Sequence, residues 1–411
     1  MTADRVLLLI IDGVSDRPCP DLRNLTPLQA AKTPVLDRIA TEGVCGIMDT
    51  IAPGIRPGSD TSHLSLLGYP PESCYTGRGP LEAVGTGILM EPGMIGFRCN
   101  YATLDNAGKV IDRRAGRIHD TADLTRAVMD GVDLSAFDIE ALFRSGTGHR
   151  AALAFRGQGL GACVSSNDPK KDGVMPPPFR PLRDTPADRR TADALNSFVR
   201  QADAILAVHP LNRDREAEGF APANTILIRG AGEMGDFQPF SERYGLSGSV
   251  IAAATLINGI GTAVGLRRVP VPGVTGSTDT NLSGKVDAVL TELETQDFVL
   301  FNIKGTDEAG HDGNAAEKRD FIEQIDAAIE PFLSIEGLLL VVCADHSTPC
   351  SIRDHSADPV PLVIRGDGVR TDAVRSYDEI ACAQGGLNRI PGSALMPIIC
   401  DLINRTNKYG A

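Results

Sequence analysis

Four short and mainly apolar runs predict strands in this chain. They cover residues 6–11, 298–303, 338–343 and 360–364. None of them alternates cleanly between apolar and polar positions, which is typical of strands buried on both faces of a parallel sheet. Between the runs, apolar residues recur every three or four positions, as at Phe321, Ile322, Ile325, Ile329 and Phe332, and at Leu195, Phe198, Val199, Ala202, Ile205 and Leu206. That spacing predicts helices, and the alternation predicts a doubly wound α/β core.

Polar residues follow three of the predicted strands closely. Asp12-Gly13 comes after the first, the segment 304–311 after the second, and Asp345-His346 after the third. Ligands of open α/β sheets bind outside the carboxyl ends of the strands. Residues from the two ends of the chain are therefore expected to meet in one crevice.

The middle of the chain differs in amino-acid composition from its ends. It contains a loop rich in proline and arginine at residues 169–190, together with polar helical patterns. This change predicts an inserted domain at residues 72–245, with the α/β core built from residues 1–71 and 246–411. A length of 411 residues also favours two domains, because one domain usually takes about 150.

Charge and cysteine content narrow the class of protein. The formal net charge of -13 argues against a nucleic-acid or anionic-membrane partner, although metals and arginines can still create a local site for a small phosphate. The nine cysteines are scattered singly without a CxxC pair, as in a cytoplasmic protein with reduced thiols. We find no signal-peptide pattern and no apolar run near the ~18 residues of a membrane span. We expect a cytoplasmic protein with a small-molecule partner, and a homo-oligomer stays open.

Aspartate and histidine cluster in a way that suggests a metal site. Asp307 and His311 are four residues apart, so both can lie on one face of a helical turn and bind one cation. Taken alone, the pair is more simply a helix N-terminus with a capping Asp and a solvated His. A metal site becomes the better interpretation because an Asp-His pair follows the third strand and a further His comes nine residues later. The candidate ligands are Asp12, Asp307, His311, Asp345, His346 and His355, a mixture that suits manganese, zinc or magnesium better than copper.

Ser59 follows Pro57-Gly58 and is a candidate nucleophile. A serine next to glycine in a loop is usually part of a turn or a helix cap. At a helix N-terminus, however, the free N–H groups would favour a phosphate, and a metal can hold the serine as its alkoxide. His63 lies close by in sequence, and we expect it to have a structural role.

The order of these motifs resembles that of the alkaline phosphatase superfamily. Longer segments are similar, nearly from end to end, to the archaeal-type cofactor-independent phosphoglycerate mutase family. They are LLLIIDGVSDRP, TPLQAAKTPVLDRIA, GSDTSHLSLLGYPP, TGRGPLEAVG, DRRAGRI, GTGHRAAL, NDP, LIRGAG, ADHSTPC and HSADPVPL. The resemblance implies an alkaline-phosphatase-like α/β fold, with a mostly parallel sheet and helices on both faces. It also implies a smaller inserted α+β domain that binds the substrate.

The resemblance implies an activity and a set of roles as well. The family interconverts 3-phosphoglycerate and 2-phosphoglycerate in glycolysis and gluconeogenesis through a phosphoserine, without 2,3-bisphosphoglycerate. Two divalent ions are implied, with manganese expected first and zinc, cobalt or magnesium as alternatives. Ser59 would be the nucleophile and Lys304 a phosphate contact. One ion would be held by Asp12, Ser59, Asp345 and His346, and the other by Asp307, His311 and His355.

The predicted insert carries groups suited to a phosphorylated acid. Arg113, Arg114 and Arg117 lie within five positions, and arginine binds carboxylate or phosphate in a bidentate manner. A solvated basic loop explains that spacing equally well. His149 and Arg150 precede an apolar strand pattern, and we expect them to contact the substrate, with His149 at its phosphate.

Further candidates come later in the insert. Asn167 and Asp168 are expected at the end of another strand, where Asp168 would move a proton between the two glycerate hydroxyls. An Asx turn at Asn167-Asp168-Pro169 is an alternative of comparable weight. Arg213 and Arg229, each beside a turn-forming segment, are candidates to clamp the substrate.

Two positions depart from the family pattern. Ala344 stands where the family usually has glycine, and its methyl group is tolerated unless the backbone needs a positive φ. Lys170 stands where the family often has histidine, which puts a substrate role of this position in doubt.

Two other functions stay open from the sequence. A phosphatase, a phosphodiesterase, or an enzyme using another acceptor such as homoserine would need the same metals and serine. A catalytically silent binding protein would keep the fold, but here every candidate ligand and the serine are present. The arginine cluster of the insert favours the mutase, because water as acceptor needs no second carboxylate site.

Overall fold

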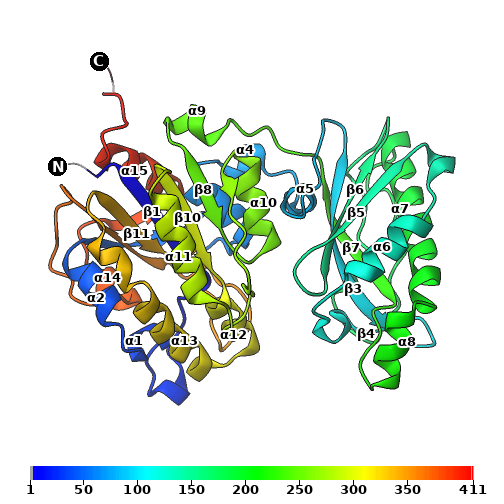
Figure 1. Ribbon diagram of the computed structural model, residues 1–411, viewed down its shortest axis with the longest axis horizontal. Helices are drawn as coiled ribbons and strands as arrows, with labels where there is room; N and C mark the ends of the chain where they lie inside the picture. Colours follow the sequence, from blue (N-terminus) through cyan, green and yellow to red (C-terminus); the bar gives the residue numbers. More distant parts are fainter. Residues whose placement is uncertain (1–2, 409, 411) are drawn as a thin grey trace. The chain divides into compact units, whose positions relative to one another are not determined.

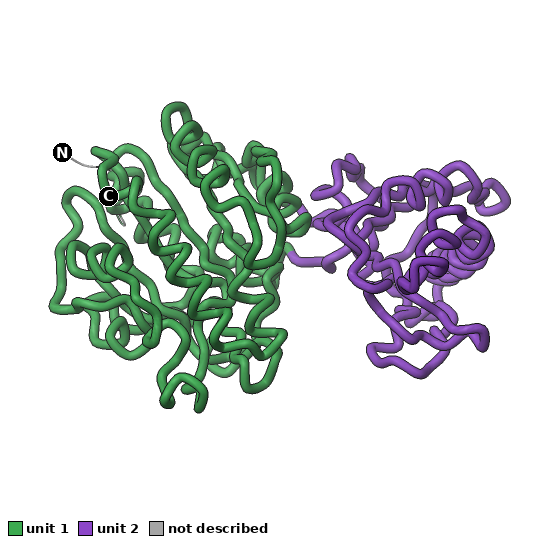
Figure 2. Tube along the Cα trace, turned by 60° about the horizontal axis from the view of Figure 1, so that its bottom comes forward, with its two compact units in different colours: residues 1–74, 237–411 green, residues 75–236 purple. Residues whose placement is uncertain are grey.

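The computed structural model describes residues 3–408 and 410. By its internal contacts the chain divides into two compact units (Figure 2). Unit 1 contains residues 1–74 and 237–411, and unit 2 contains residues 75–236. The assignment of a metal-binding core at 1–71 and 246–411, and of a substrate-binding insert at 72–245, stays a prediction.

Unit 1 is built on an eight-stranded sheet (Figure 1). In spatial order its strands are β13 (Asn388–Pro391), β2 (Val44–Asp49), β12 (Val360–Arg365), β11 (Leu338–Cys343), β1 (Arg5–Ile11), β10 (Phe298–Ile303), β8 (Gly248–Ile251) and β9 (Arg267–Arg268). All four predicted strands are present. Only β12 runs antiparallel to its neighbours, so the sheet is mostly parallel, as predicted. The apolar run could not reveal that reversal, because a central strand is buried on both faces in either direction.

The register of the central strands places their carboxyl ends side by side. Ile11 of β1 pairs with Ile303 of β10, and Ile10 pairs with Cys343 of β11. Residues 6–11 of β1 are completely buried between these neighbours. Whatever follows the three strands therefore meets at one edge of the sheet.

Helices cover the sheet of unit 1 in two layers (Figure 1). One layer contains α2 (Pro34–Thr41), α11 (Leu282–Leu293) and α13 (Ala315–Ala328), and the other contains α3 (Ser59–Leu66), α10 (Thr255–Ala263) and α15 (Leu395–Leu402). The predicted helix around residues 321–332 is α13 followed by a short 3-10 turn that buries Phe332. The shorter helices are η1 (Pro20–Leu22), α1 (Pro27–Ala30), α4 (Pro71–Cys74), α9 (Phe240–Tyr244), α12 (Gly305–Asp312), η4 (Glu330–Ser334), α14 (Glu379–Cys382) and η5 (Gly392–Ala394).

Unit 2 is an antiparallel sheet with helices, which confirms the smaller α+β part of the predicted fold. Its strands are β3 (Ile95–Leu104), β4 (Val110–Asp112), β5 (Glu140–Ser145), β6 (Arg150–Arg156) and β7 (Thr225–Gly232). The central strand β3 pairs with β6 and β7, and its end pairs with β4. Its helices are α5 (Arg78–Gly85), η2 (Ala115–Arg117), α6 (Ala122–Gly131), η3 (Ser135–Phe137), α7 (Pro186–Ala207) and α8 (Pro210–Ala217).

Two details of unit 2 differ from the sequence-based expectation. The loop expected at 169–190 ends earlier, because α7 begins at Pro186, where the Thr185 side chain accepts a hydrogen bond from the Asp188 N–H. Asn167 and Asp168 do not end a strand. Their segment forms only a single bridge, from Val164 to Pro181, because the N–H groups of Cys163 and Arg180, which would extend the ladder, donate to the side chains of Asp188 and Ser165.

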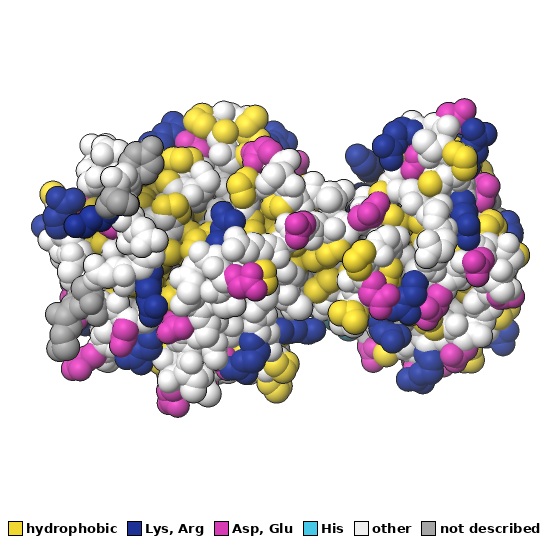
Figure 3. All heavy atoms as spheres, turned by 90° about the horizontal axis from the view of Figure 1, so that it is seen from above, with side chains coloured by type: hydrophobic (Ala, Val, Ile, Leu, Met, Phe, Trp, Pro, Cys, Tyr) yellow, Lys and Arg dark blue, Asp and Glu magenta, His cyan; other side chains and the backbone are white. Residues whose placement is uncertain are grey.

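The surface carries charges of both signs. On the face drawn in Figure 3, basic and acidic side chains are interspersed. Among the described residues, we find no helix of the length and apolarity that crossing a membrane requires.

Candidate metal centre and nucleophile

The three aligned strand ends of unit 1 bring together Asp12, Lys304 and Asp345. Asp12-Gly13 needs its glycine for two reasons. Gly13 has a φ of +66°, and a Cβ there would lie 2.5 Å from Thr348 Oγ1. Ala344 has no positive φ, so its extra methyl group introduces no backbone strain.

The first group of metal-binding atoms contains Asp12, Asp345 and His346, all buried. His346 Nε2 lies 3.2 Å from Asp345 Oδ2 and 3.8 Å from Asp12 Oδ1. Asp345 Oδ1 accepts hydrogen bonds from the N–H groups of Gly13 and His346, whereas its Oδ2 is buried without a hydrogen-bond partner among the described residues. Burial, and then the Asp12 carboxylate, raise the pKa of Asp345 to about 7. A buried carboxylate oxygen that has no hydrogen-bond partner is suited to binding a cation.

The second group centres on Asp307. As predicted, α12 carries Asp307 and His311 one turn apart, and His311 Nε2 lies 3.4 Å from Asp307 Oδ1. His355 Nε2 lies 3.5 Å from the same oxygen. Burial alone would raise the pKa of Asp307, but the Lys304 ammonium and the nearby imidazoles hold it well below its usual value. The His346 and His355 rings stack at 3.6 Å, so the two groups are neighbours.

All three candidate imidazole ligands use Nδ1 for a hydrogen bond to the surrounding structure, which leaves Nε2 to face the site. Nδ1 of His311 donates to the Arg353 carbonyl at 3.0 Å, and Nδ1 of His355 donates to the Pro57 carbonyl at 2.9 Å. The Thr348 hydroxyl donates its hydrogen to Asp307, so at 3.1 Å it accepts from Nδ1 of His346. These bonds select the tautomer with a lone pair on Nε2, which is the usual preparation of a metal ligand. The donor set therefore fits divalent cations.

Lys304 connects the two groups. Its Nζ lies 3.2 Å from Asp12 Oδ1 and 2.6 Å from Asp307 Oδ2. Burial would lower the pKa of this ammonium, but Asp12, Asp307 and Asp345 together raise it. Lys304 is thus charged, and it has the reach to exchange a carboxylate for a phosphate oxygen.

Ser59 is the first residue of α3, as the nucleophile hypothesis requires. Gly58 is the N-cap, so the Ser59 hydroxyl is not used for capping. Its Oγ lies 3.1 Å from His346 Nε2, and the side chain is 7% exposed. A hydroxyl beside candidate metal ligands at a helix N-terminus can both lose its proton and receive a phosphoryl group.

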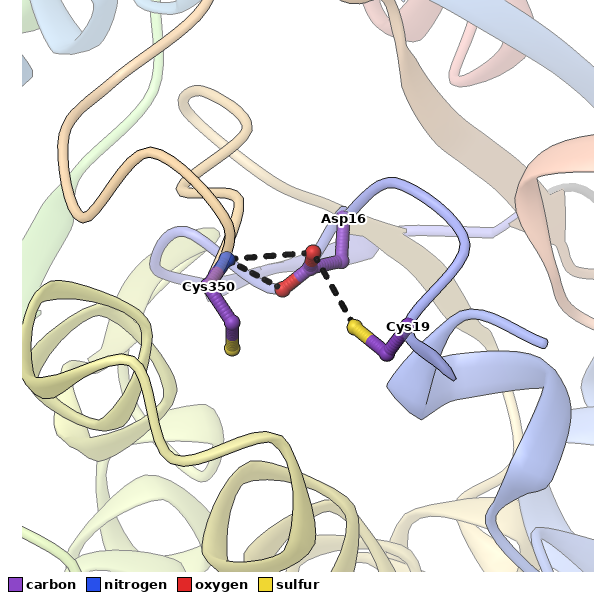
Figure 4. Close-up of side chains that lie close together, drawn as sticks. All are labelled: Asp16, Cys19 and Cys350. Carbon is purple, nitrogen blue, oxygen red and sulfur yellow. Dashed lines mark hydrogen bonds between the residues drawn. The ribbon is translucent and has the colours of Figure 1, made fainter. Parts of the chain in front are cut away.

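A third group, Asp16, Cys19 and Cys350, also lies close together (Figure 4). Its carboxylate already accepts hydrogen bonds from the N–H groups of Arg17 and Cys350. The buried Lys318 ammonium lies 2.8 Å from Asp16 Oδ2. Because both oxygens of the Asp16 carboxylate already accept hydrogen bonds, we interpret the group as a structural link between the loops after β1 and β11.

In unit 2, two arginines bind Asp168. Arg113 makes a bidentate pair with it at 3.0 and 2.9 Å, and Arg229 donates to the same carboxylate. The Lys170 N–H also donates to Asp168, which is the Asx turn that the sequence left as an alternative. Lys170 has a φ of +60° there. The Asn167 side-chain amide donates a hydrogen bond to the Ile226 carbonyl and accepts one from the Ile228 N–H, both in β7. These two bonds favour a structural role.

The other predicted substrate residues of unit 2 are more dispersed. Arg114 precedes η2, Arg150 begins β6, and both lower the pKa of His149. Arg213 is exposed on α8.

Glu82 was not among the residues predicted from the sequence. It is buried, and its Oε1 lies 2.9 Å from Arg78 Nε and 3.6 Å from Arg98 Nε. The spacing of Arg78 and Glu82 by four residues within α5 was a local signal for this pair.

His149 is neutral at ordinary pH. Burial, followed by the charges of Arg150 and Arg114, lowers its pKa from 6.5 to about 3. The phosphate contact predicted for His149 would therefore be a hydrogen bond from a neutral imidazole and not an ion pair.

The stability of the protein should consequently depend on His149 in acid. Between pH 6.5 and about 3 the unfolded chain takes up a proton at this residue and the folded chain does not, so stability falls as pH falls. The loss is at most about 1.4 kcal/mol per pH unit. We expect His149→Gln to flatten the fall in urea-unfolding free energy between pH 6.5 and 4.5. The exposed His119→Gln is the control, and equal slopes in wild type and His149→Gln would contradict the assignment.

Comparison with known proteins identifies the family of this chain. The metalloenzyme superfamily model matches residues 4–402. The chain is 64% identical to the 2,3-bisphosphoglycerate-independent phosphoglycerate mutase of Methanosphaerula palustris over 100% of both chains. It is 48% identical to mutase 1 of Archaeoglobus fulgidus over 99% of this chain and 100% of the relative.

Two solved structures are similar to this chain in fold and sequence. A protein from Pyrococcus horikoshii matches with a TM-score of 0.85 and 33% identity over 100% of both chains. The cofactor-independent phosphoglycerate mutase of Thermoplasma acidophilum matches with a TM-score of 0.68 and 36% identity, over 98% of this chain and 100% of that one. The fold and site thus define a metalloenzyme that uses divalent metal ions. Within that superfamily, the chain belongs to the 2,3-bisphosphoglycerate-independent phosphoglycerate mutases.

Proposed function

We propose that this chain interconverts 3-phosphoglycerate and 2-phosphoglycerate, in glycolysis and gluconeogenesis, through a phosphoserine at Ser59. One observation carries the proposal. The Ser59 hydroxyl lies at the N-terminus of α3, 3.1 Å from His346 Nε2, beside two groups of carboxylates and imidazoles. Family membership supports the same reaction without 2,3-bisphosphoglycerate.

Two divalent ions per chain belong to the proposal, with manganese first and zinc, cobalt or magnesium as alternatives. Bound ions would supply Lewis-acid stabilisation and a lowered pKa for the hydroxyl. One would be held by Asp12, Ser59, Asp345 and His346, and the other by Asp307, His311 and His355. The Nδ1 bonds of His311 and His355, which leave Nε2 facing the site, and the unpartnered Asp345 Oδ2 support this set.

The chain's own residues perform the transfer. Ser59 Oγ gives up its proton and forms a bond to phosphorus while the substrate's phosphate ester bond breaks. The leaving oxygen takes up a proton, which leaves glycerate with two free hydroxyls. Lys304 contacts the phosphate oxygens, and the second transfer returns the phosphoryl group to either hydroxyl. Asp168 moves the proton between those hydroxyls. Arg113, Arg114, Arg150, Arg213 and Arg229 bind the carboxylate and phosphate, with His149 as a neutral donor.

The arginines of unit 2 favour a mutase over a phosphatase. A hydrolytic enzyme needs no group that retains the glycerate, whereas a mutase must hold it between two transfers. The pairing of Asp168 with Arg113 and Arg229 supplies both a proton carrier and carboxylate-binding groups in one place.

A coupled assay tests the proposed function. Purified enzyme loaded with manganese, given 3-phosphoglycerate and enolase, should produce phosphoenolpyruvate without added bisphosphoglycerate. Inorganic phosphate as the main product would indicate a phosphatase instead. No product with manganese, cobalt, zinc or magnesium would contradict the mutase.

A further inference from the structure

His63 and Asn302 form a buried polar pair that the reaction described above does not use. Both side chains are completely buried in unit 1. His63 lies one turn after Ser59 on α3, and its Nδ1 is 2.7 Å from the Ser59 carbonyl oxygen. Asn302 is near the end of β10, and its Nδ2 lies 3.3 Å from His63 Nε2 and 3.0 Å from Asp12 Oδ2.

The hydrogens of this pair can be assigned from its partners. A carbonyl oxygen only accepts, so His63 Nδ1 carries the hydrogen and Nε2 presents a lone pair. The Asn302 amide then donates one hydrogen to His63 and the other to Asp12. The opposite amide orientation would place an oxygen against the Asp12 carboxylate, so it is excluded. We call this series of three hydrogen bonds the relay. It runs from the Ser59 carbonyl through His63 and Asn302 to Asp12.

The relay is held firmly at the Asn302 end. The Lys285 ammonium donates to the Asn302 carbonyl at 2.8 Å, which fixes the main chain. Asn302 Oδ1 is buried without a hydrogen-bond partner among the described residues. Buried unsatisfied polar atoms are rare and usually serve a purpose, so the amide is retained for its two donated bonds. His63 Nδ1 also lies 3.5 Å from Asp345 Oδ2, which brings the relay next to a second candidate ligand.

We propose that His63 and Asn302 are positioning residues that fix the Ser59 hydroxyl relative to the Asp12 and Asp345 carboxylates. The inference rests on the proposed function, because a nucleophile needs such alignment only if phosphorus is transferred to it. Ser59 is the first residue of a helix, where backbone constraint is weakest. The relay ties this turn to β10 and, through Asp12, to the end of β1. Neither side chain touches the hydroxyl itself, so both act through their neighbours.

Variants of the full-length, manganese-loaded enzyme test the relay. His63→Leu and Asn302→Leu should each lower kcat by about ten- to a hundredfold, the usual effect of losing a residue that orients a metal ligand. KM for 3-phosphoglycerate should change less than about twofold, because neither residue belongs to the proposed arginine contacts. His63→Asn should recover part of kcat, since its Nδ2 can replace Nδ1 as donor to the Ser59 carbonyl. Ser65→Ala, on the same helix, is the control.

Manganese affinity provides a readout besides activity. Asn302→Leu frees Asp12 from its orienting bond, so we expect manganese to bind about tenfold more weakly at one of two sites. Unchanged kcat and unchanged affinity in folded variants would overturn the relay. So would a fall in kcat that matches the lost folded fraction in calorimetry and is not recovered by His63→Asn.

The wild-type enzyme tests the relay even if a variant fails to fold. Histidine-selective ¹⁵N spectra should show His63 as the neutral tautomer with its hydrogen on Nδ1, and a hydrogen on Nε2 would overturn the assignment. The failure of the proposed function is distinguishable. An inactive wild type would contradict the proposed mutase activity. The manganese affinity of the variants and the ¹⁵N spectra of the wild type would then still test the relay. An active wild type with unaffected variants would sink the relay alone.

Discussion

Replacing Ser59 with alanine should lower kcat for phosphoglycerate interconversion by at least about a thousandfold, because it removes the atom that carries the phosphoryl group between hydroxyls. Folding should be little affected, within about 1 kcal/mol, since Gly58 rather than Ser59 caps α3. The measurement is the enolase-coupled rate at saturating 3-phosphoglycerate, together with the metal content of the variant.

Ser62→Ala is the matched control for this prediction. Ser62 lies on the same helix and is buried, but its hydroxyl donates to the Gly58 carbonyl and away from the metal ligands. The control should keep nearly all of the activity. Substantial turnover by Ser59→Ala, or an equal loss in both variants, would contradict the role of Ser59.

Removal of the divalent ions should have the second largest effect. Asp12, Asp307 and Asp345 are buried together, with Lys304 as the cation that joins them. A chelator should therefore abolish activity, and it should lower the melting temperature because each ion at a thousand times its Kd stabilises the fold by about 4 kcal/mol. Dialysis against chelator, elemental analysis and calorimetry measure this, and added manganese should restore both properties.

The two proposed ion sites can be separated by substitution. Asp307→Ala should leave about one ion per chain of the two proposed, whereas Asp354→Asn, an exposed carboxylate next to His355, should retain both. Full activity in protein from which the ions have been removed would contradict the metal-dependent mechanism. Loss of both ions in Asp307→Ala would contradict two separable sites.

The edge of the sheet that carries the site could be predicted from sequence because its signals are local. Apolar runs, interrupted only by Asn302 in β10, identified β1, β10 and β11, and the polar residues directly after them identified the edge where ligands bind. The spacing of Asp307 and His311 was likewise contained in one helical turn. The direction of β12 was not predictable, since a buried strand has the same composition in either direction.

The residues that orient the ligands were missed because their partners are distant in the chain. Asn302 is the single polar residue in the run Phe298–Ile303, and that exception was a usable signal. Its partners Asp12 and His63 are more than 200 residues away, so its role follows only from the fold. Thr348 orients both Asp307 and His346, and nothing in the sequence around it specifies that.

Electrostatic properties were the least predictable part of the site. The sequence presents His149 as a residue able to carry charge, but burial and the arginines around it keep it neutral. Asp168 was assigned as a proton carrier, and only the fold brings Arg113 and Arg229 to its carboxylate. Both effects require segments that are far apart in sequence to be packed together.

The central claim is that phosphate passes through Ser59, and trapping the intermediate tests it most directly. The manganese-loaded enzyme should be mixed with 3-phosphoglycerate, quenched in acid during turnover, digested and analysed by mass spectrometry. We expect one phosphoryl group on the peptide that contains Ser59. It should be absent from Ser59→Ala and lost when substrate is exhausted and removed. Phosphate on another residue, or none on an enzyme that is turning over, would contradict it.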